Sequence, residues 1–444
     1  GSGHENESSM TTFAVEIVQN GSTLQIGGKA WTSTTGSLKR YELPAGTYYL
    51  GSDISPQYTI KIENNVTLCL HWHKITAADG MDAIYMTGGS FTLTDCKGIG
   101  TITHASSKTG RGVYVSSGTF NMYGGSITGN KAQDAQGRGG GVYVYSGSGT
   151  FNMYGGSITG NRATGDGGGV DKSGSNSSFN MYGGSITGNT ANSYGGGVYV
   201  DGGGFTMSGG TIGGTKTGET NTATYGGGGV YAKANFEMTG GSITGNETNR
   251  GGGVYVTGKG SFTMSASADG QNIPSITGNN ATENGGGVYV RDIAKKMNVS
   301  GDVKIENNWK GGTLNADTGL YGKGDNGSAN NLYLDTGKIV TIDDSDGLSS
   351  NARISITTVD KPKNDKNVQI ASGAKDGVDY TQIFTPDEAD KGYTVSRTAF
   401  DNLNLHQHSW GYTNDGADTI KATCTDPTCS SPNGGSVTIK APDE

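Results

Sequence analysis

The chain has 444 residues, among them 80 glycines and 8 prolines; 16% of the residues are charged, and the net charge at pH 7 is −8. The negative charge and the lack of lysine or arginine clusters argue against a nucleic-acid or membrane-surface partner, and no apolar run of about 18 residues is present to cross a bilayer. Glycine enrichment without a three-residue period, together with regularly spaced apolar residues, argues against a collagen-like or disordered chain and predicts short strands joined by tight turns.

The first 110 residues precede the regular part of the sequence. Residues 1–12 are interpreted as a tag and linker in front of a fragment cut from a longer protein. Residues 13–60 are expected to form an N-terminal cap, because the open end of a repeat array exposes unpaired backbone groups. Residues 61–110 contain two irregular copies of a repeat, VTLCLHWHKI and SFTLTDCKGIGTI.

One phrase, for example GGGVYVYSGSGTFNMYGGSITGN at residues 139–161, returns through the middle of the chain. Its phenylalanines are spaced by 26 to 31 residues: Phe120, Phe151, Phe179, Phe205, Phe236 and Phe262. Within each copy, apolar and polar residues alternate over three short segments, which predicts three strands per unit. Three strands with glycine-rich corners are typical of one turn of a three-sided parallel β-helix, right-handed by the usual rule for parallel connections.

The predicted fold class is therefore all-β, a right-handed parallel β-helix of about nine or ten turns over residues 61–345. In the copy at residues 139–161, the side chains expected to point inward are Val142, Val144, Phe151, Met153 and Ile158. An asparagine ends each copy, and its amide is expected to form a hydrogen-bonded ladder along one corner. The asparagines of this ladder are Asn130, Asn161, Asn189, Asn246 and Asn279.

The repeat decays after Val290. Residues 346–405 are expected to form a C-terminal cap, for the same reason as the N-terminal one. Residues 406–444 are expected to form a small β-module that contains a cysteine pair and begins a following repeat.

Tyrosine occupies the centre of the V-Y-V phrase, between two valines expected to point inward. Strand alternation then places these tyrosines outward in one column. The column, with the adjoining Tyr145, comprises Tyr114, Tyr143, Tyr199, Tyr231, Tyr255 and Tyr289; a shorter outward column comprises Tyr123, Tyr154 and Tyr182. Two interpretations stay open: a ladder that stabilises neighbouring strands, or an exposed aromatic surface that binds sugar rings or a partner protein.

One copy breaks the tyrosine column. In GGGVDKSGSN, Asp171 replaces the tyrosine and Lys172 occupies an inward valine position. The next two copies offer Asp201 and Lys233. Carboxylates on one face of a β-helix are the arrangement of a glycan-cleaving enzyme, so Asp171, Asp201 and Lys233 are the alternative catalytic set. The other interpretation is a local bulge or a polar notch in the core.

Four cysteines form two spaced pairs. Cys69 and Cys96 lie about one turn apart, and either a disulfide or two buried free thiols fits that spacing. Cys424 and Cys429, with His406 and His408, form a set that suits tetrahedral zinc. A local disulfide between Cys424 and Cys429 is the favoured alternative in an exported protein.

No cofactor is expected other than a structural calcium or zinc ion. The segments DDSDG at residues 343–347 and KGDNGSANN at residues 323–331 carry oxygen ligands of the kind that hold calcium, but neither matches an EF-hand loop. Both are interpreted as surface loops.

The repeats resemble a known class of protein. The segments GTYYLGSDI, VTLCLHWHKI and FTLTDCKGIGTI, followed by copies of FNMYGGSITGN and GGGVYV, resemble the right-handed β-helix region of large Gram-positive bacterial surface proteins. The GGGVY and ITGN phrases are also similar to the repeats of polymorphic outer-membrane adhesins. The resemblance covers residues 40–405 and implies the fold, but it transfers no catalytic residue.

We therefore expect a monomeric, extracellular, non-enzymatic adhesin on a bacterial cell surface. Its expected partner is a host or cell-surface glycan or a glycoprotein such as mucin or immunoglobulin, contacted by the tyrosine column. No nucleic-acid partner and no membrane insertion by this fragment are expected. The alternatives are a polysaccharide lyase or glycoside hydrolase centred on Asp171 and Asp201, and a passive surface spacer.

Overall fold

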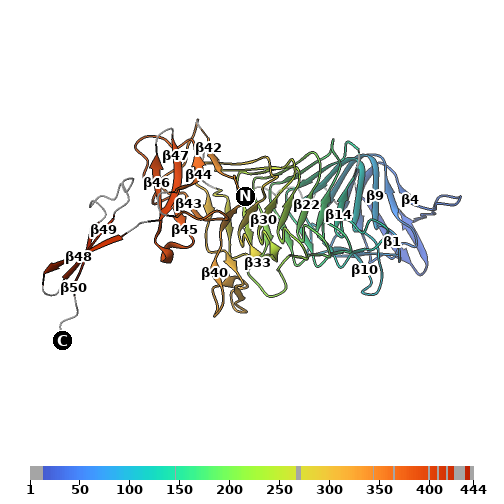
Figure 1. Cartoon of the computed structure of the whole chain (residues 1–444). Coiled ribbons are helices and arrows are strands. Elements are labelled where there is room, and N and C mark those ends of the chain that lie inside the picture. Colours follow the sequence, from blue (N-terminus) through green and yellow to red (C-terminus); the bar gives the residue numbers. More distant parts are fainter. Residues whose placement is uncertain are drawn as a thin grey trace.

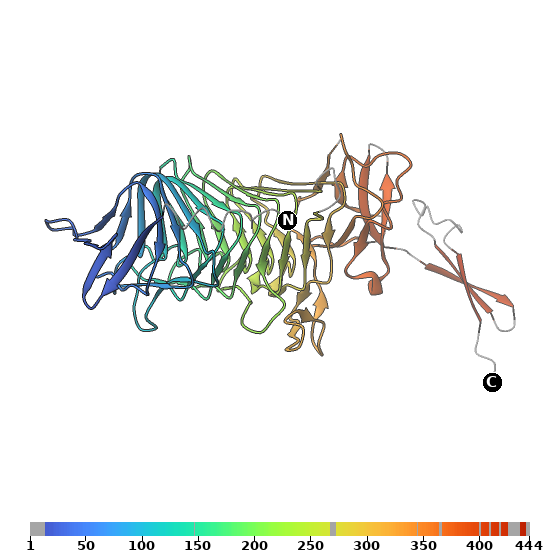
Figure 2. The same ribbon diagram turned by 180° about the vertical axis from the view of Figure 1, so that it is seen from behind.

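The structure is a computed structural model that describes residues 14–145, 147–266, 272–343, 345–363, 366–398 and 401–407, and strands β48 (Trp410–Gly416), β49 (Thr419–Cys424) and β50 (Ser436–Lys440). The chain is 49% strand and 1% helix and forms a β-solenoid of about 13 turns with parallel sheets. Figure 1 shows the strands stacked side by side along one axis in sequence order, and Figure 2 shows the same stack from behind. The predicted fold class is confirmed. The turns outnumber the nine or ten expected because divergent turns at both ends lack the repeated phrase.

A regular coil contains four strands, one more than predicted. In the coil that begins at Gly139 these are β14 (Val142–Val144), β15 (Thr150–Met153), β16 (Ser157–Thr159) and β17 (Arg162–Ala163). Each pairs in parallel with its counterparts in the neighbouring coils. The strands thus form four columns along the solenoid, and the fourth column is a separate sheet of very short strands.

The first column contains, besides β14, the strands β4 (Tyr41–Leu43), β6 (Ile60–Ile62), the start of β9 (Ile84–Thr94), the start of β11 (Val113–Met122), β18 (Val170–Lys172), β22 (Val198–Val200), β26 (Val230–Ala232), β30 (Val254–Val256), β34 (Val288–Val290), β41 (Leu332–Leu334), the end of β43 (Arg353–Thr358) and β45 (Phe384–Pro386). The second contains, besides β15, β1 (Val15–Asn20), β5 (Gly46–Leu50), β7 (Val66–Cys69), the ends of β9 and β11, β19 (Ser178–Met181), β23 (Gly204–Met207), β27 (Asn235–Met238), β31 (Ser261–Ser265), β35 (Lys296–Ser300), β42 (Val340–Ile342) and β44 (Val368–Ser372).

The third column contains, besides β16, the strands β8 (Lys74–Ala77), β10 (Thr101–His104), β12 (Ser126–Thr128), β20 (Ser185–Thr187), β24 (Thr211–Gly213), β28 (Ser242–Thr244), β32 (Ser275–Thr277), β36 (Lys304–Ile305) and the start of β43. The fourth contains, besides β17, β13 (Lys131–Ala132), β21 (Thr190–Ala191), β25 (Thr222–Ala223), β29 (Glu247–Arg250), β33 (Asn280–Asn284), β37 (Trp309–Lys310) and the antiparallel β40 (Ser328–Ala329).

Antiparallel pairs lie at both ends of the coil. At the N-terminal end, β1 pairs with β2 (Thr23–Ile26), which pairs with β3 (Lys29–Ala30). At the C-terminal end, after a short 3-10 helix at Ala389–Lys391, β46 (Tyr393–Thr398) and β47 (Asn402–Gln407) form a hairpin, and β47 also pairs with β44. A small ribbon of β38 (Thr313–Leu314) and β39 (Tyr321–Gly322) lies in a side loop, and β48, β49 and β50 pair with one another.

The interior is filled as strand alternation predicts. Val142, Val144, Phe151, Met153 and Ile158 are all fully buried. The phenylalanines of successive coils stack with ring centroids 4.6–5.3 Å apart. The sequence pattern therefore identifies the core side chains of the regular coils.

The glycine triplet before each V-Y-V phrase is needed for close approach between coils. Gly139 has a left-handed φ of 65° that favours glycine. A Cβ on Gly140 would lie 2.6 Å from the carbonyl oxygen of Gly168 in the next coil, which is closer than real contacts allow. The triplet is therefore required for packing between coils.

Replacing Met181 by alanine is expected to destabilise the protein by about 3 kcal/mol, because the change opens a cavity in a fully buried position. The shift of the urea unfolding midpoint measures the effect. The adjacent Asn180 points outward and is the matched control, for which less than about 1 kcal/mol is expected after Asn180→Ala. Equal effects of the two changes would contradict the assigned directions of these side chains.

Candidate functional site

The tyrosines of the first column point away from the core valines, but they are not exposed. Tyr143, Tyr199, Tyr231, Tyr255 and Tyr289 are between 1% and 8% exposed. From Tyr199 to Tyr333 the rings stack with centroids 5.0–5.3 Å apart. The expected exposure of this column is therefore wrong for these five rings, while Tyr114 and Tyr145 are half-buried.

Segments between the third column and the glycine triplets cover these rings. The Tyr143 hydroxyl donates to Gln136 Oε1 at 3.1 Å, and the Arg111 guanidinium lies 4.8 Å from the Tyr143 ring centroid. Tyr194 packs on Tyr231 with a centroid separation of 4.5 Å. Strand alternation indicates which side of a strand a residue occupies, but it does not predict what lies over that side.

The shorter column is the exposed one. Tyr123, Tyr154 and Tyr182 are 53%, 40% and 48% exposed, and their rings stack at 4.5 and 4.8 Å with tilts of 8° and 11°. We call these three residues the exposed tyrosine ladder. They lie at the corner between the second and third strand columns, one in each of three successive coils.

The second strand column beside the ladder presents an uncharged polar face. Asn180 donates to Asn152, which donates to Asn121, each at 2.9 Å between side-chain amides, and Asn121 donates to Ser90 at 3.2 Å. Threonine and serine form a parallel row, in which Ser178 donates to Thr150 at 3.3 Å. The coils that carry the ladder therefore combine aromatic edges with fixed amide and hydroxyl groups on a flat surface.

The break in the buried column brings several ionisable groups together. Asp171 lies between Tyr143 and Tyr199 in strand register and is fully buried. Its Oδ1 accepts a hydrogen bond from the Ser173 hydroxyl, whereas its Oδ2 is buried without a partner. Burial raises the pKa of Asp171 to about 8, against the opposing effects of Ser173 and of the nearby Arg138 guanidinium.

Lys172 points into the core, in register with Val144 and Val200, as the sequence predicts. It is fully buried, and its ammonium donates to the carbonyl oxygens of Gly174 and Gly202. Burial lowers its pKa to about 8. Strand β18 therefore carries a buried ionisable side chain on each of its faces, Asp171 on the outer face and Lys172 on the core face; we call this pair the buried notch.

The alternative catalytic set does not form an accessible acid–base pair. Asp201 forms an ion pair with Lys233 at 2.8 Å between Oδ1 and Nζ, at the surface. Asp171, in contrast, is enclosed, so a polymeric substrate has no access to its carboxyl group. The two carboxylates thus lie in different environments, one at the surface and one in the interior.

The cysteines and metal candidates are only partly within the described residues. Cys69 and Cys96 form a disulfide that links consecutive coils. His406 is buried on β47 beside the Thr394 hydroxyl, whereas His408, Cys429 and the Cys424 side chain lie outside the described residues. Among the residues that the structure describes, no three histidine, cysteine, aspartate or glutamate side chains gather as metal ligands.

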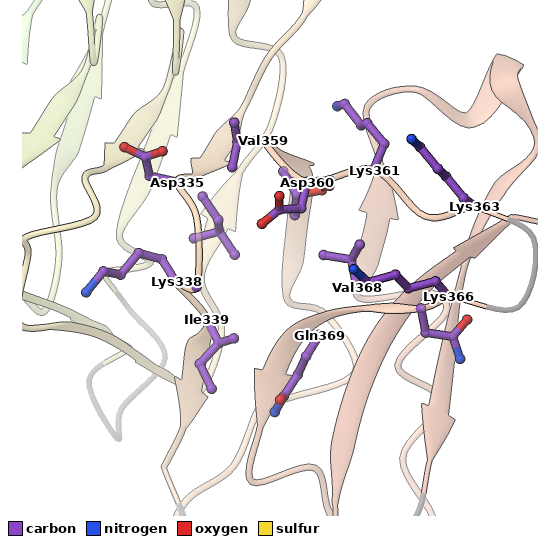
Figure 3. A pocket seen from close by; sticks show the side chains of 14 residues that line it. Asp335, Lys338, Ile339, Val359, Asp360, Lys361, Lys363, Lys366, Val368 and Gln369 are labelled. Carbon is purple, nitrogen blue, oxygen red and sulfur yellow. Dashed lines mark hydrogen bonds between the residues drawn. The ribbon is translucent and has the colours of Figure 1, made fainter.

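A cleft of about 640 Å³ lies near the C-terminal end, between the loop after β41 and the start of β44. Figure 3 shows Asp360 and Lys366 pointing into it and Lys338 pointing away. Lys338 donates to the Ala294 carbonyl at 2.7 Å, and Lys361 pairs with Glu388. Both signs of charge line the cleft and two of its four lysines have protein partners, so its chemistry selects no ligand class.

The fold and surface define a parallel β-solenoid protein with a buried and an exposed tyrosine column. No protein-family model, curated protein or solved structure matches the chain. The described part of the chain has no helix with the length and hydropathy of a membrane span.

Proposed function

We propose that this protein is a non-enzymatic binding protein of the adhesin type, displayed outside the cell, which recognises a glycan or a glycoprotein through the exposed tyrosine ladder. The observation that carries the proposal is the exposure of three stacked tyrosines on an otherwise small-residue, polar surface. Tyrosine is a preferred contact residue because it buries a large area and keeps a hydroxyl for hydrogen bonding.

The rigidity of the ladder supports this role. Each tyrosine is held by backbone hydrogen bonds to the preceding coil: Tyr154 donates to Met122 and Tyr182 donates to Met153, both at 2.8 Å. Contact with its neighbours orders each ring before a ligand arrives. Binding then loses little conformational entropy, which favours recognition by a preformed surface.

Display outside the cell is supported by the disulfide between Cys69 and Cys96, since such bonds persist in oxidising compartments. The resemblance of the repeats to bacterial surface proteins points the same way. A host glycan, mucin or immunoglobulin remains the proposed class of partner.

The proposal is tested on an array of glycans, mucins and serum glycoproteins, probed with the wild-type chain and the triple variant Tyr123→Ala/Tyr154→Ala/Tyr182→Ala. The triple variant is expected to bind at least tenfold more weakly, because each lost ring removes contact area. Tyr225, which is 56% exposed but lies beside the fourth column, provides the matched control Tyr225→Ala, expected to bind like the wild type.

Two outcomes would contradict the proposal. Full binding by the triple variant would place the binding surface elsewhere. A wild-type chain that binds no partner on the array would favour the passive spacer. The enzyme alternative predicts that the wild-type chain releases reducing sugar from a glycan and that Asp171→Asn does not. The burial of Asp171 does not support this alternative.

A further inference from the structure

The turn between β7 and β8 is strained. His71 and Trp72 have φ angles of 51° and 61°, which place two consecutive non-glycine residues in the left-handed region. Each such residue costs about 1–3 kcal/mol, and such strain is concentrated at functional sites. Trp72 is nevertheless 48% exposed, so burial of its indole does not offset the strain.

The surrounding residues fix this turn. The Trp72 backbone N–H donates to Asp95 Oδ1 at 3.1 Å, and His73 Nδ1 lies 3.1 Å from Asp53 Oδ1. The disulfide between Cys69 and Cys96 ties the same turn to the next coil. The fold therefore holds an exposed indole in an unfavourable backbone conformation, instead of relaxing it.

The indole belongs to a small aromatic cluster. The His71 ring stacks on it with a centroid separation of 4.2 Å and a tilt of 29°, and the Tyr49 ring meets His71 edge-on at 5.5 Å. Lys97 Nζ is 6.0 Å from the indole centroid, at the outer limit of a cation–π contact. His71 Nδ1 is buried without a hydrogen-bond partner. Packing against His71 orders the indole, and the ring keeps an exposed surface.

Strand register places this cluster on the same corner as the exposed tyrosine ladder. Tyr49 is in register with Cys69, and Cys69 with Thr94. Tyr123 follows Met122, which is in register with Leu93, so Tyr123 occupies the position of Thr94 in the next coil. From Tyr49 to Tyr182 the corner crosses six coils, about 25 Å at the usual spacing between strands.

The two aromatic groups offer complementary contacts. In the ladder the stacked rings cover one another's faces, so only ring edges and hydroxyl groups are open to a ligand. Trp72, in contrast, leaves part of its indole ring exposed. Between them the outward side chains of the second strand column are uncharged, with Asn121, Asn152 and the neighbouring threonines. The charged groups nearest to Trp72 at this corner are Asp95, which accepts from the Trp72 backbone N–H, and Lys97. A neutral, hydroxyl-rich chain suits this surface, because its ring C–H groups pack on the indole and its hydroxyls bond to amides and phenols.

We propose that the Trp72 turn and the exposed tyrosine ladder form one elongated site for an extended, uncharged glycan chain that lies along this corner, with Trp72 as the stacking platform. This inference rests on the proposed function and adds the ligand class and the second contact point. A pyranose unit is about as long as the spacing of one coil, so a chain of about six units spans the corner.

The test uses an array of unbranched neutral oligosaccharides of two to eight units: β-linked glucose, galactose, mannose and N-acetylhexosamine chains. Wild-type affinity is expected to rise with chain length and level off near six units. Trp72→Asn removes the indole, while asparagine tolerates the left-handed conformation, so the variant should unfold at the same temperature as the wild type or higher. Its binding to six-unit chains is expected to fall at least tenfold, and Trp72→Phe is expected to restore part of the loss.

The outcomes separate this inference from the proposed function. Loss of binding in the tyrosine triple variant, with unchanged binding in Trp72→Asn at every chain length, overturns the inference and leaves the proposed function standing. Binding of glycoproteins but of no neutral oligosaccharide also overturns it. A lower unfolding temperature in Trp72→Asn would show that the turn is held by packing and not by function, and would equally contradict it.

Discussion

Replacing Asn189 by alanine is expected to lower the free energy of unfolding by about 3–5 kcal/mol. Asn189 is fully buried, and its Oδ1 accepts from the backbone N–H and the side-chain amide of Asn161 at 3.0 and 3.1 Å. Its Nδ2 donates to the Ile158 carbonyl at 2.9 Å and to Asn221 Oδ1 at 3.0 Å. Without this amide, buried polar groups in the neighbouring coils lose their partners, at about 1–3 kcal/mol each.

The urea unfolding midpoint, at an unchanged slope, measures this loss. Asn152→Ala is the matched control, since Asn152 is the same residue type in the partly exposed amide row on the second column. Water replaces its lost hydrogen bonds, so less than about 1 kcal/mol is expected. Similar effects at the two positions would mean that the buried ladder does not stabilise the coil more than the surface row does.

The sequence predicts this ladder because its asparagines recur at one place in the repeat. The structure extends it through Asn221, Asn308 and Asn331, with Asp387 accepting from Asn331 at its end. Asn221 occurs in TNTA, where its neighbours Asn189 and Asn246 occur in GNTA and GNET, so a looser pattern would have found it. Asn308 and Asn331 belong to divergent coils, where the phrase around them has changed.

The candidate surface was less predictable than the core. Val142 and Phe151 point inward because strand alternation fixes their direction, and close packing then requires apolar side chains there. Tyr143 and Tyr154 both point outward, yet only Tyr154 is exposed. The difference depends on Gln136 and Arg111, which come from segments of variable sequence and cover Tyr143.

The sequence does not predict the Trp72 turn, since its features are conformational. HWH follows a strand and carries no glycine or asparagine that would indicate left-handed backbone. The sequence does not decide between a disulfide and two free thiols, because Cys69 is in register with Thr94 and not with Cys96. The corner after β9 brings Cys96 back to Cys69. Corners, unlike strands, have no repeating pattern of residue directions from which such contacts follow.

The buried notch at Asp171 is expected to make stability depend on pH. The folded-state pKa of Asp171 is about 8, raised from 3.8 by burial, so between these values the folded protein keeps a proton that the unfolded chain has lost. Stability therefore falls as pH rises from about 4 to about 8, by up to about 5 kcal/mol at 1.36 kcal/mol per unit. Asparagine has nearly the same shape as protonated aspartic acid but does not ionise. The free energy of unfolding of Asp171→Asn should therefore equal that of the wild type near pH 4 and exceed it at pH 8.

Unfolding midpoints in urea from pH 4 to 8 measure this difference. The other charged groups that act on Asp171 are Arg138, Asp166 and Asp201. The adjacent Lys172 affects stability in a different pH range. The pKa of Lys172 is lowered from 10.5 to about 8, so between these values the unfolded chain binds a proton that the folded protein has lost. Stability therefore rises with pH above about 8, outside the pH range in which Asp171 acts. Parallel pH profiles for the wild type and Asp171→Asn would mean that Asp171 is ionised and solvated in the folded protein. Such a result would reopen the enzymatic alternative, because an accessible carboxylate at this break is what that mechanism requires.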